Sequence, residues 1–163
     1  MTRHLVIPSP VGPLTLVAQD EILTGVYFSG HDPAPNQAFG PADSDALLRQ
    51  TETELNEYFA GERKVFTVPR RGQGTPFQQQ VWAELEKIPY GTVISYAELA
   101  KRVGNPGGSR AVGGANGRNP ISIIVPCHRV TQSDGSLGGF GGGLPTKRFL
   151  LELEGIMPPT LPL

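Results

Sequence analysis

The first 28 residues alternate short apolar runs with turn residues. The runs HLVIP, LTLVAQ and ILTGVYF are rich in aliphatic and β-branched side chains, and SPVGP separates the first two. This pattern predicts three strands of an antiparallel meander. A loop rich in Pro, Gly and Ala follows from Ser29 to Ala42. The next stretch, DSDALLRQTETELNEYFAGE, has apolar residues at helical spacing, which predicts an amphipathic helix covering the small sheet.

The pattern changes after the polar, Gly-rich segment RRGQG. In TPFQQQVWAELEKIPYG, Thr75 and Gln78 have the spacing of a capping box, and Pro76 occupies a first-turn position. Apolar residues then recur on one face of the predicted helix, with Trp82 expected in the core. We therefore predict an α+β fold. Residues 1–72 form an N-terminal lobe with a small antiparallel sheet and a helix, and residues 73–163 form a mostly helical C-terminal lobe.

Two further helices are predicted in SYAELAKRVGNPGGSRAVGGANG. Ser95 and Glu98 have capping-box spacing, Gly104 can end the first helix, and the second follows after a very short turn. Such a pair in a basic segment is typical of a helix-turn-helix. Gly113 and Gly114 each destabilise the second helix by about 1 kcal/mol relative to Ala. Its smooth face suits the DNA minor groove, about 6 Å wide, or alternatively a tight contact between helices within the protein.

Composition narrows the class of protein. The chain has 163 residues, a formal net charge of −1 and one cysteine. No apolar run has the roughly 18 residues of a membrane span, and the N-terminus lacks a signal-peptide pattern, so we expect a cytoplasmic protein. Between Leu99 and Ser133 five Lys or Arg residues occur without an acidic residue. This excess fits a nucleic-acid-binding surface as well as a solvated patch.

The single cysteine lies in NPISIIVPCHRV. Pro120 and Pro126 favour extended geometry in the residues before them, so we expect a rigid, buried, extended segment with Cys127 at its end. A lone cysteine is often an inert apolar residue, but His128 and Arg129 are nearby cations that favour the thiolate. One cysteine and three scattered histidines lack the spacing of a zinc site.

From about Thr75 to Gly155 the sequence resembles the O6-alkylguanine-DNA alkyltransferases. The resemblance rests on PCHRV preceded by NP, on RAVGGA upstream and on LLELEG downstream. It implies a repair protein that binds duplex DNA through a helix-turn-helix in the minor groove. Such a protein flips an alkylated guanine out and transfers the alkyl group irreversibly to cysteine. No cofactor or metal is implied.

The resemblance also implies catalytic roles. Cys127 is the acceptor, His128 removes its proton through a water, and Glu154 orients the imidazole. Tyr96 donates a proton to the leaving base, and Asn119 is a hinge. Other readings of these residues are an exposed carboxylate for Glu154, a partly buried Tyr at a helix start and an Asn that caps a turn.

The remaining implied site residues contact DNA or the alkylated base. Arg110 fills the gap left by the flipped nucleotide, or alternatively contacts phosphate. The implied DNA-binding residues are Arg110, Ala111, Gly114, Ala115, Asn116 and Arg118. The implied substrate pocket contains Val130, Phe140, Gly141 and Gly142. Many relatives have Tyr where this chain has Phe140 and some have Ser where it has Gly141, which leaves the range of alkyl groups open.

The implied partner is duplex DNA with O6-alkylguanine. Activity on O4-alkylthymine and cooperative assembly on DNA stay open, and a monomer without membrane association is expected. Two other functions compete with this one. A cysteine hydrolase or acyltransferase would release product from Cys127 by hydrolysis but would leave the smooth helix unexplained. A non-catalytic sensor would bind alkylated DNA without repair, although relatives of that kind lack the cysteine.

Overall fold

The chain divides into two compact units in the computed structural model, which describes residues 2–29 and 45–156. Unit 1 contains Met1–Gln73 and Pro120–Ile124, and unit 2 contains Gly74–Asn119 and Val125–Leu163. The segment Pro120–Ile124 was expected in the C-terminal lobe but groups with the N-terminal residues. The boundary between residues 72 and 73 otherwise stays a prediction. The predicted loop from Ser29 to Ala42 lies, apart from Ser29, outside the described residues.

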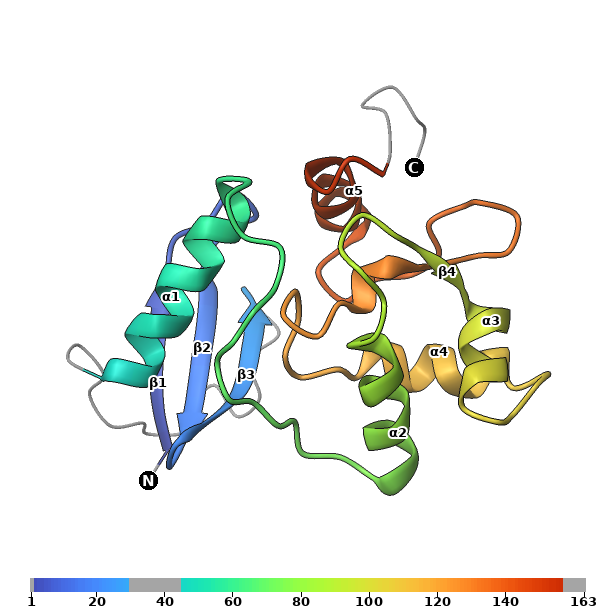
Figure 1. Cartoon of the computed structure of the whole chain (residues 1–163), viewed down its shortest axis with the longest axis horizontal. Helices are drawn as coiled ribbons and strands as arrows, with labels where there is room; N and C mark the ends of the chain where they lie inside the picture. Colours follow the sequence, from blue (N-terminus) through green and yellow to red (C-terminus); the bar gives the residue numbers. More distant parts are fainter. Residues whose placement is uncertain (1, 30–44, 157–163) are drawn as a thin grey trace. The chain divides into compact units, whose positions relative to one another are not determined.

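Unit 1 is built on the predicted meander. Its strands are β1 (Thr2–Ile7), β2 (Leu14–Gln19) and β3 (Ile22–Phe28), paired antiparallel in the order β1-β2-β3. The helix α1 (Ala46–Phe59) begins at Asp45, whose side chain accepts from the Leu48 amide at 2.9 Å, and packs against the sheet (Figure 1). The predicted α+β class of fold is confirmed.

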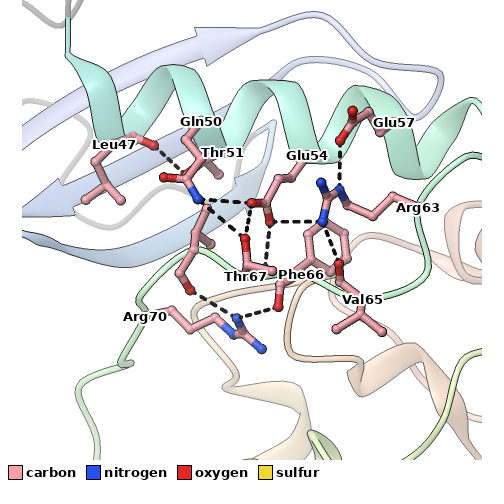
Figure 2. Close-up of polar contacts among 11 residues, drawn as sticks. Leu47, Gln50, Thr51, Glu54, Glu57, Arg63, Val65, Phe66, Thr67 and Arg70 are labelled. Atoms are coloured by element: carbon pink, nitrogen blue, oxygen red, sulfur yellow. Dashed lines mark hydrogen bonds and ion pairs between the residues drawn. The ribbon is translucent and has the colours of Figure 1, made fainter.

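The face of α1 that meets the sheet is not purely apolar. Leu48, Leu55 and Tyr58 are fully buried as the periodicity predicts, and so are Thr51 and the carboxylate residue Glu54. Figure 2 shows the polar contacts that surround Glu54. A buried carboxylate is tolerated when hydrogen bonds replace its hydration, and here the bonds come from α1 and from the segment that follows it.

The outer edge of β3 is paired with two short segments. Leu23 bonds to the backbone around Arg70, and Val26 bonds to Pro120 and Ser122. These bonds satisfy backbone groups that would otherwise form an open sheet edge. They also explain why Pro120–Ile124 belongs to unit 1.

Unit 2 is mostly helical. Its helices are α2 (Pro76–Leu85), α3 (Tyr96–Arg102), α4 (Ser109–Gly117) and α5 (Leu144–Leu153), with one turn of 3-10 helix, η1 (Cys127–Arg129). A parallel bridge joins β4 (Ile94–Ser95) to β5 (Val130–Thr131). The capping box of Thr75 and Gln78 is complete, and Ser95 accepts from the Glu98 amide at 3.0 Å. Both predicted helix starts are confirmed.

The expectation of an extended segment up to Cys127 is wrong. Only the part near Ile121 pairs as a strand would, and the chain then turns at Ile123, whose φ is 73°. The backbone reverses because Ile124 bonds back to Ser122, and Cys127 starts the 3-10 turn η1 rather than ending a strand. A proline restricts the residue before it, but it does not extend a whole segment.

No helix within residues 2–29 and 45–156 combines the length and the apolar character that crossing a bilayer requires.

Candidate active site and DNA-binding helix

Cys127 is a buried residue whose main chain is held by hydrogen bonds. It is 5% exposed, and its amide bonds to the Val125 carbonyl at 2.8 Å. The side-chain amide of Asn119 donates to the same carbonyl, also at 2.8 Å. Asn119 and Val125 flank the segment Pro120–Ile124, so this hydrogen bond connects the two ends of that segment. Its predicted role as a hinge stays a prediction, but the contact fixes the backbone at Val125, two residues before the cysteine.

His128 and Glu154 form a buried pair. His128 Nε2 lies 2.7 Å from Glu154 Oε2, and both side chains are fully buried. The alternative of an exposed carboxylate at Glu154 is therefore wrong. Glu154 follows α5 as its C-cap, and the Gly91 amide also donates to its Oε1 at 3.1 Å.

Arg129 completes this network. Its guanidinium donates from Nε to Glu154 Oε1 at 2.9 Å and from Nη2 to Oε2 at 3.1 Å, which is a bidentate pair. Nη1 donates to the Ile88 carbonyl at 2.7 Å. We expected this cation to favour the Cys127 thiolate, but its donors are directed to the carboxylate.

The charges in this network follow from burial and pairing. Burial raises the pKa of Glu154, but bonds and charge from His128 and Arg129 outweigh it and lower that pKa to about 2. Burial also lowers the pKa of His128, so the imidazole is neutral at neutral pH. With Nε2–H donated to the carboxylate, Nδ1 carries the lone pair. No residue in the described part of the chain bonds to His128 Nδ1. This nitrogen can accept a proton.

Lys147 is a buried cation that the sequence analysis missed. It is fully buried on α5, and Nζ donates to the carbonyls of Val130 at 2.7 Å, Leu137 at 2.5 Å and Gly139 at 3.4 Å. Burial lowers its pKa to about 8, and the charge of a Cys127 thiolate acts in the opposite direction. By the same attraction, the ammonium favours the thiolate.

The helical spacing of residues in and just after α5 could have predicted that Lys147 is buried. Lys147, Leu150, Leu151 and Glu154 are spaced as one face of a helix, and all four are buried. A charged residue at an apolar position of the helical pattern is rarely buried without a partner. Both charged members of this face belong to the site.

Tyr96 opens α3 beside the same centre. Burial and the negative charge of Cys127 raise the pKa of its phenol, whereas hydrogen bonding by Asn116 lowers it. Lys147 Nζ lies 5.8 Å from the centre of the Tyr96 ring. The phenol is therefore protonated at neutral pH and lies within the electrostatic reach of the sulfur.

The predicted DNA-binding residues divide into two groups. Arg110, Ala111, Gly114 and Arg118 are exposed, whereas Ala115 and Asn116 are buried. At Gly114 a Cβ atom would meet no described atom within 4 Å, which fits an open, smooth face. The burial of Ala115 and Asn116 leaves only their backbones for contact with DNA. Their side chains pack inward.

The inward side of α4 is anchored on α2. Trp82 Nε1 donates to the Ala115 carbonyl at 2.9 Å, so the tryptophan is a core residue with its one polar group satisfied. α4 also packs against α3, which follows the expected arrangement of a helix-turn-helix.

The expected pocket residues lie in β5 and in the loop that precedes α5. Val130 is buried in β5, Phe140 and Gly142 are half-buried, and Gly141 is exposed. The Gly143 amide bonds to the Phe140 carbonyl at 3.0 Å and closes the turn before α5. Whether these residues contact a substrate stays a prediction. In residues 2–29 and 45–156, no three His, Cys, Asp or Glu side chains cluster to hold a metal ion.

Two family descriptions match nearly the whole chain. Residues 2–70 match "6-O-methylguanine DNA methyltransferase, ribonuclease-like domain", and residues 76–156 match "6-O-methylguanine DNA methyltransferase, DNA binding domain". The chain belongs to the 6-O-methylguanine DNA methyltransferase family. The helix-turn-helix and the network of His128, Arg129 and Glu154 therefore lie in the part that matches the DNA-binding domain of this family.

Individual relatives agree. A protein of Mycobacterium tuberculosis named methylated-DNA--protein-cysteine methyltransferase is 47% identical over 94% of this chain and 93% of its own length. A protein of the same name from Haemophilus influenzae is 46% identical over 91% of this chain and 84% of its own. The crystal structure of Mycobacterium tuberculosis O6-methylguanine methyltransferase superposes with a TM-score of 0.87, at 46% identity, over 98% of this chain and 96% of that one.

Proposed function

We propose that this protein repairs O6-alkylguanine in duplex DNA by transferring the alkyl group to Cys127 in a single, irreversible turnover. One observation carries the proposal. The only cysteine of the chain precedes a buried, neutral imidazole whose outer nitrogen has no partner among the described residues, and a buried carboxylate holds the other nitrogen. The names of the 46–47% identical relatives, which are methylated-DNA--protein-cysteine methyltransferases, support the same activity.

His128, Tyr96 and one water supply and take up the protons that the transfer requires. The thiol proton passes through a water to Nδ1 of His128, and the sulfur attacks the alkyl carbon. A sulfur–carbon bond forms while the carbon–O6 bond breaks, and its electron pair stays on the guanine. The ring takes the phenol proton of Tyr96, and the imidazolium returns a proton to the phenolate. Thiol and alkylated guanine become thioether and guanine.

Glu154 and Arg129 support His128, which accepts the thiol proton. The carboxylate holds Nε2–H and stabilises the imidazolium once it forms, as in other Cys-His-carboxylate arrangements. Arg129 keeps that carboxylate ionised in the buried site. Lys147 favours the attacking thiolate and ties three loop carbonyls together.

DNA binding falls to α3 and α4. The exposed face of α4 presents Arg110, Ala111, Gly114 and Arg118 to the minor groove, where small side chains permit close approach. Arg110 takes the place of the flipped nucleotide, which offsets part of an unstacking cost of a few kcal/mol. A solved Mycobacterium tuberculosis relative in complex with DNA, TM-score 0.85 and 46% identical over 94% of this chain and 91% of that one, supports this partner.

The proposal extends to the oligomeric state, the location and the groups that hold the alkylated base. The protein acts as a monomer in the cytoplasm on O6-alkylguanine, without a cofactor. Phe140 and Gly141 offer no hydroxyl group to the base, so Val130, Gly142 and backbone groups near Gly143 hold it instead.

The test is a mass measurement. The protein is incubated with excess duplex DNA carrying O6-methylguanine, and the intact mass and the Cys127 peptide are followed. We expect one methyl group per protein on Cys127, no further repair after one equivalent, and no modification of C127S. Unmodified duplex is the control.

Two outcomes would contradict the proposal. Repair of many equivalents with bare Cys127 would indicate a hydrolytic enzyme. Tight binding of the alkylated duplex without any transfer would indicate a sensor.

A further inference from the structure

Both helices of the helix-turn-helix are bonded near their C-terminal ends to side chains of α2. The last carbonyl groups of a helix have no partner within the helix, and side chains can supply the missing donor. Gln80 Nε2 donates to the carbonyl of Val103, the C-cap of α3, at 3.0 Å. Trp82 Nε1 donates to the carbonyl of Ala115, in the last turn of α4, at 2.9 Å. α2, which packs against α3 and α4, therefore holds the end of each helix (Figure 1).

The bond from Trp82 is buried and well constrained. Both Trp82 and Ala115 are buried, and an indole nitrogen can only donate. A Cβ atom at Gly74 would clash with the Trp82 ring, so the ring packs directly on the main chain just before α2. This contact restricts the ring, and the hydrogen bond fixes which of its edges faces α4.

The Ala115 carbonyl lies where α4 ends. It also accepts from the Arg118 amide at 3.2 Å, and Arg118 belongs to the exposed, predicted DNA-binding face. The segment before Cys127 is held by a separate bond, from the Asn119 side chain to the Val125 carbonyl at 2.8 Å. A displacement of the Ala115 carbonyl would therefore move Arg118, while the Asn119 bond keeps its hold on that segment.

The helix α4 needs support from its neighbours. It starts at Gly108, which has no side chain to cap the first turn, and Gly113 and Gly114 weaken its interior. Packing alone does not require a donor on α2. Phenylalanine would fill most of the volume of Trp82, and methionine has the length of Gln80, yet neither would bond to a carbonyl. The two donors are therefore better explained by the carbonyls that they hold.

We propose that Gln80 and Trp82 are positioning residues for DNA repair, which orient the helix-turn-helix by donating to the C-terminal carbonyls of α3 and α4. This inference rests on the proposed function and adds one helix to the DNA-binding unit. It gives Trp82, expected only in the core, a second role. Because both side chains act on the main chain of the DNA-binding helices, their loss should weaken duplex binding and spare the chemistry at Cys127.

The first experiment tests the indole bond by NMR spectroscopy. Trp82 is the single tryptophan of the chain, so its indole N–H gives one identifiable resonance. We expect this N–H to be protected from solvent exchange to the same degree as backbone amides within α2, because it is buried and bonded. Exchange as fast as in free tryptophan would overturn the proposal.

The second experiment tests the role with W82F and Q80M, which retain much of each side chain and remove the donor. Binding to an unmodified labelled duplex is measured by fluorescence anisotropy, and methyl transfer is measured from free O6-methylguanine base. We expect each variant to bind the duplex roughly fivefold more weakly, as for one lost hydrogen bond, and to react with the free base at the wild-type rate. Q19M, at an exposed glutamine of β2, is the matched control and should bind like wild type.

The outcomes separate positioning from folding. Wild-type duplex binding by the folded variants, or equal loss on duplex and free base, would overturn the proposal. Should W82F fail to fold, Q80M still decides, because Gln80 is exposed and its replacement should leave the fold intact. Absence of methyl transfer in wild type would instead refute the proposed function, while duplex binding by the variants would still report on this inference.

Discussion

Two buried glutamates, Glu54 in unit 1 and Glu154 in unit 2, have similar burial and different surroundings. They are 3% and 6% exposed, and hydrogen bonds lower the pKa of both against the effect of burial. Glu54 accepts from the Thr67 amide at 2.8 Å, the Thr67 hydroxyl at 2.6 Å and Gln50 at 3.1 Å (Figure 2). Arg63 is 4.0 Å away.

The partners of Glu154 are of another kind. Two of them, His128 and Arg129, are titratable or charged, and Gly91 adds a backbone amide. The Glu54 network joins α1 to the segment after it and is a structural clamp. The Glu154 network reaches an imidazole nitrogen that has no partner in the described part of the chain. A buried carboxylate therefore indicates chemistry when its network ends in a group that can still exchange a proton.

The largest expected effect is that of E154Q. The neutral amide leaves the Arg129 charge buried without its partner, which we expect to destabilise the protein by about 3–5 kcal/mol. Loss of the oriented imidazole should slow methyl transfer by roughly 100-fold. Urea unfolding and single-turnover rates measure the two effects.

The matched control for E154Q lies two residues earlier. Glu152 pairs with Arg148 at 2.8 Å on the partly exposed side of α5, and E152Q should change stability by less than about 1 kcal/mol. An E154Q protein that transfers methyl at the wild-type rate would remove the distinction between the two glutamates.

The next effect is the dependence of stability on pH. The pKa of Glu154 is about 2 in the folded protein against an ordinary 4.5, so its contribution is present above pH 4.5 and is lost as the pH falls toward 2. A difference of this size corresponds to about 3 kcal/mol. His128, whose folded pKa is also lowered, acts in the same direction below its ordinary 6.5.

Urea midpoints from pH 7 to pH 3 test this dependence. E154Q should lose less stability than wild type over this range, because its side chain does not titrate. A parallel decline of the two proteins would show that Glu154 is not the group responsible.

The smallest effect is expected for E54Q. A glutamine can still accept from the Thr67 amide, so we expect a loss of about 1–2 kcal/mol from weaker, uncharged hydrogen bonds. Methyl transfer and DNA binding should stay at wild-type values. Slower transfer by E54Q at full folding would show that this clamp also serves the reaction.

The sequence predicted the regular elements well. The three strands, the helix after them and the capped starts of α2 and α3 all lie where the local pattern put them. Periodicity and capping are properties of neighbouring residues, so the chain carries this information locally. The helix α4 was also expected, although its two central glycines weaken it.

Prediction failed where long-range pairing decides the backbone. Prolines suggested an extended approach to Cys127, but pairing of Val26 with residues near Pro120 bends the chain first. The hydrogen-bond partners of buried polar groups could not be predicted from the sequence either. Glu54 bonds to a residue 13 positions away, and Lys147 bonds to carbonyls 8 to 17 positions away.

The sequence by itself determined the elements, the family resemblance, and the candidate site at the only cysteine, which a histidine follows. It could do so because these depend on residue types at short, regular spacing. Only the tertiary structure decided that Arg129 faces Glu154, that Lys147 is the cation near the sulfur, and that the Asn116 side chain turns inward. A hydrogen bond is made by whichever donor the fold brings within about 3 Å, and chain neighbours do not specify that donor.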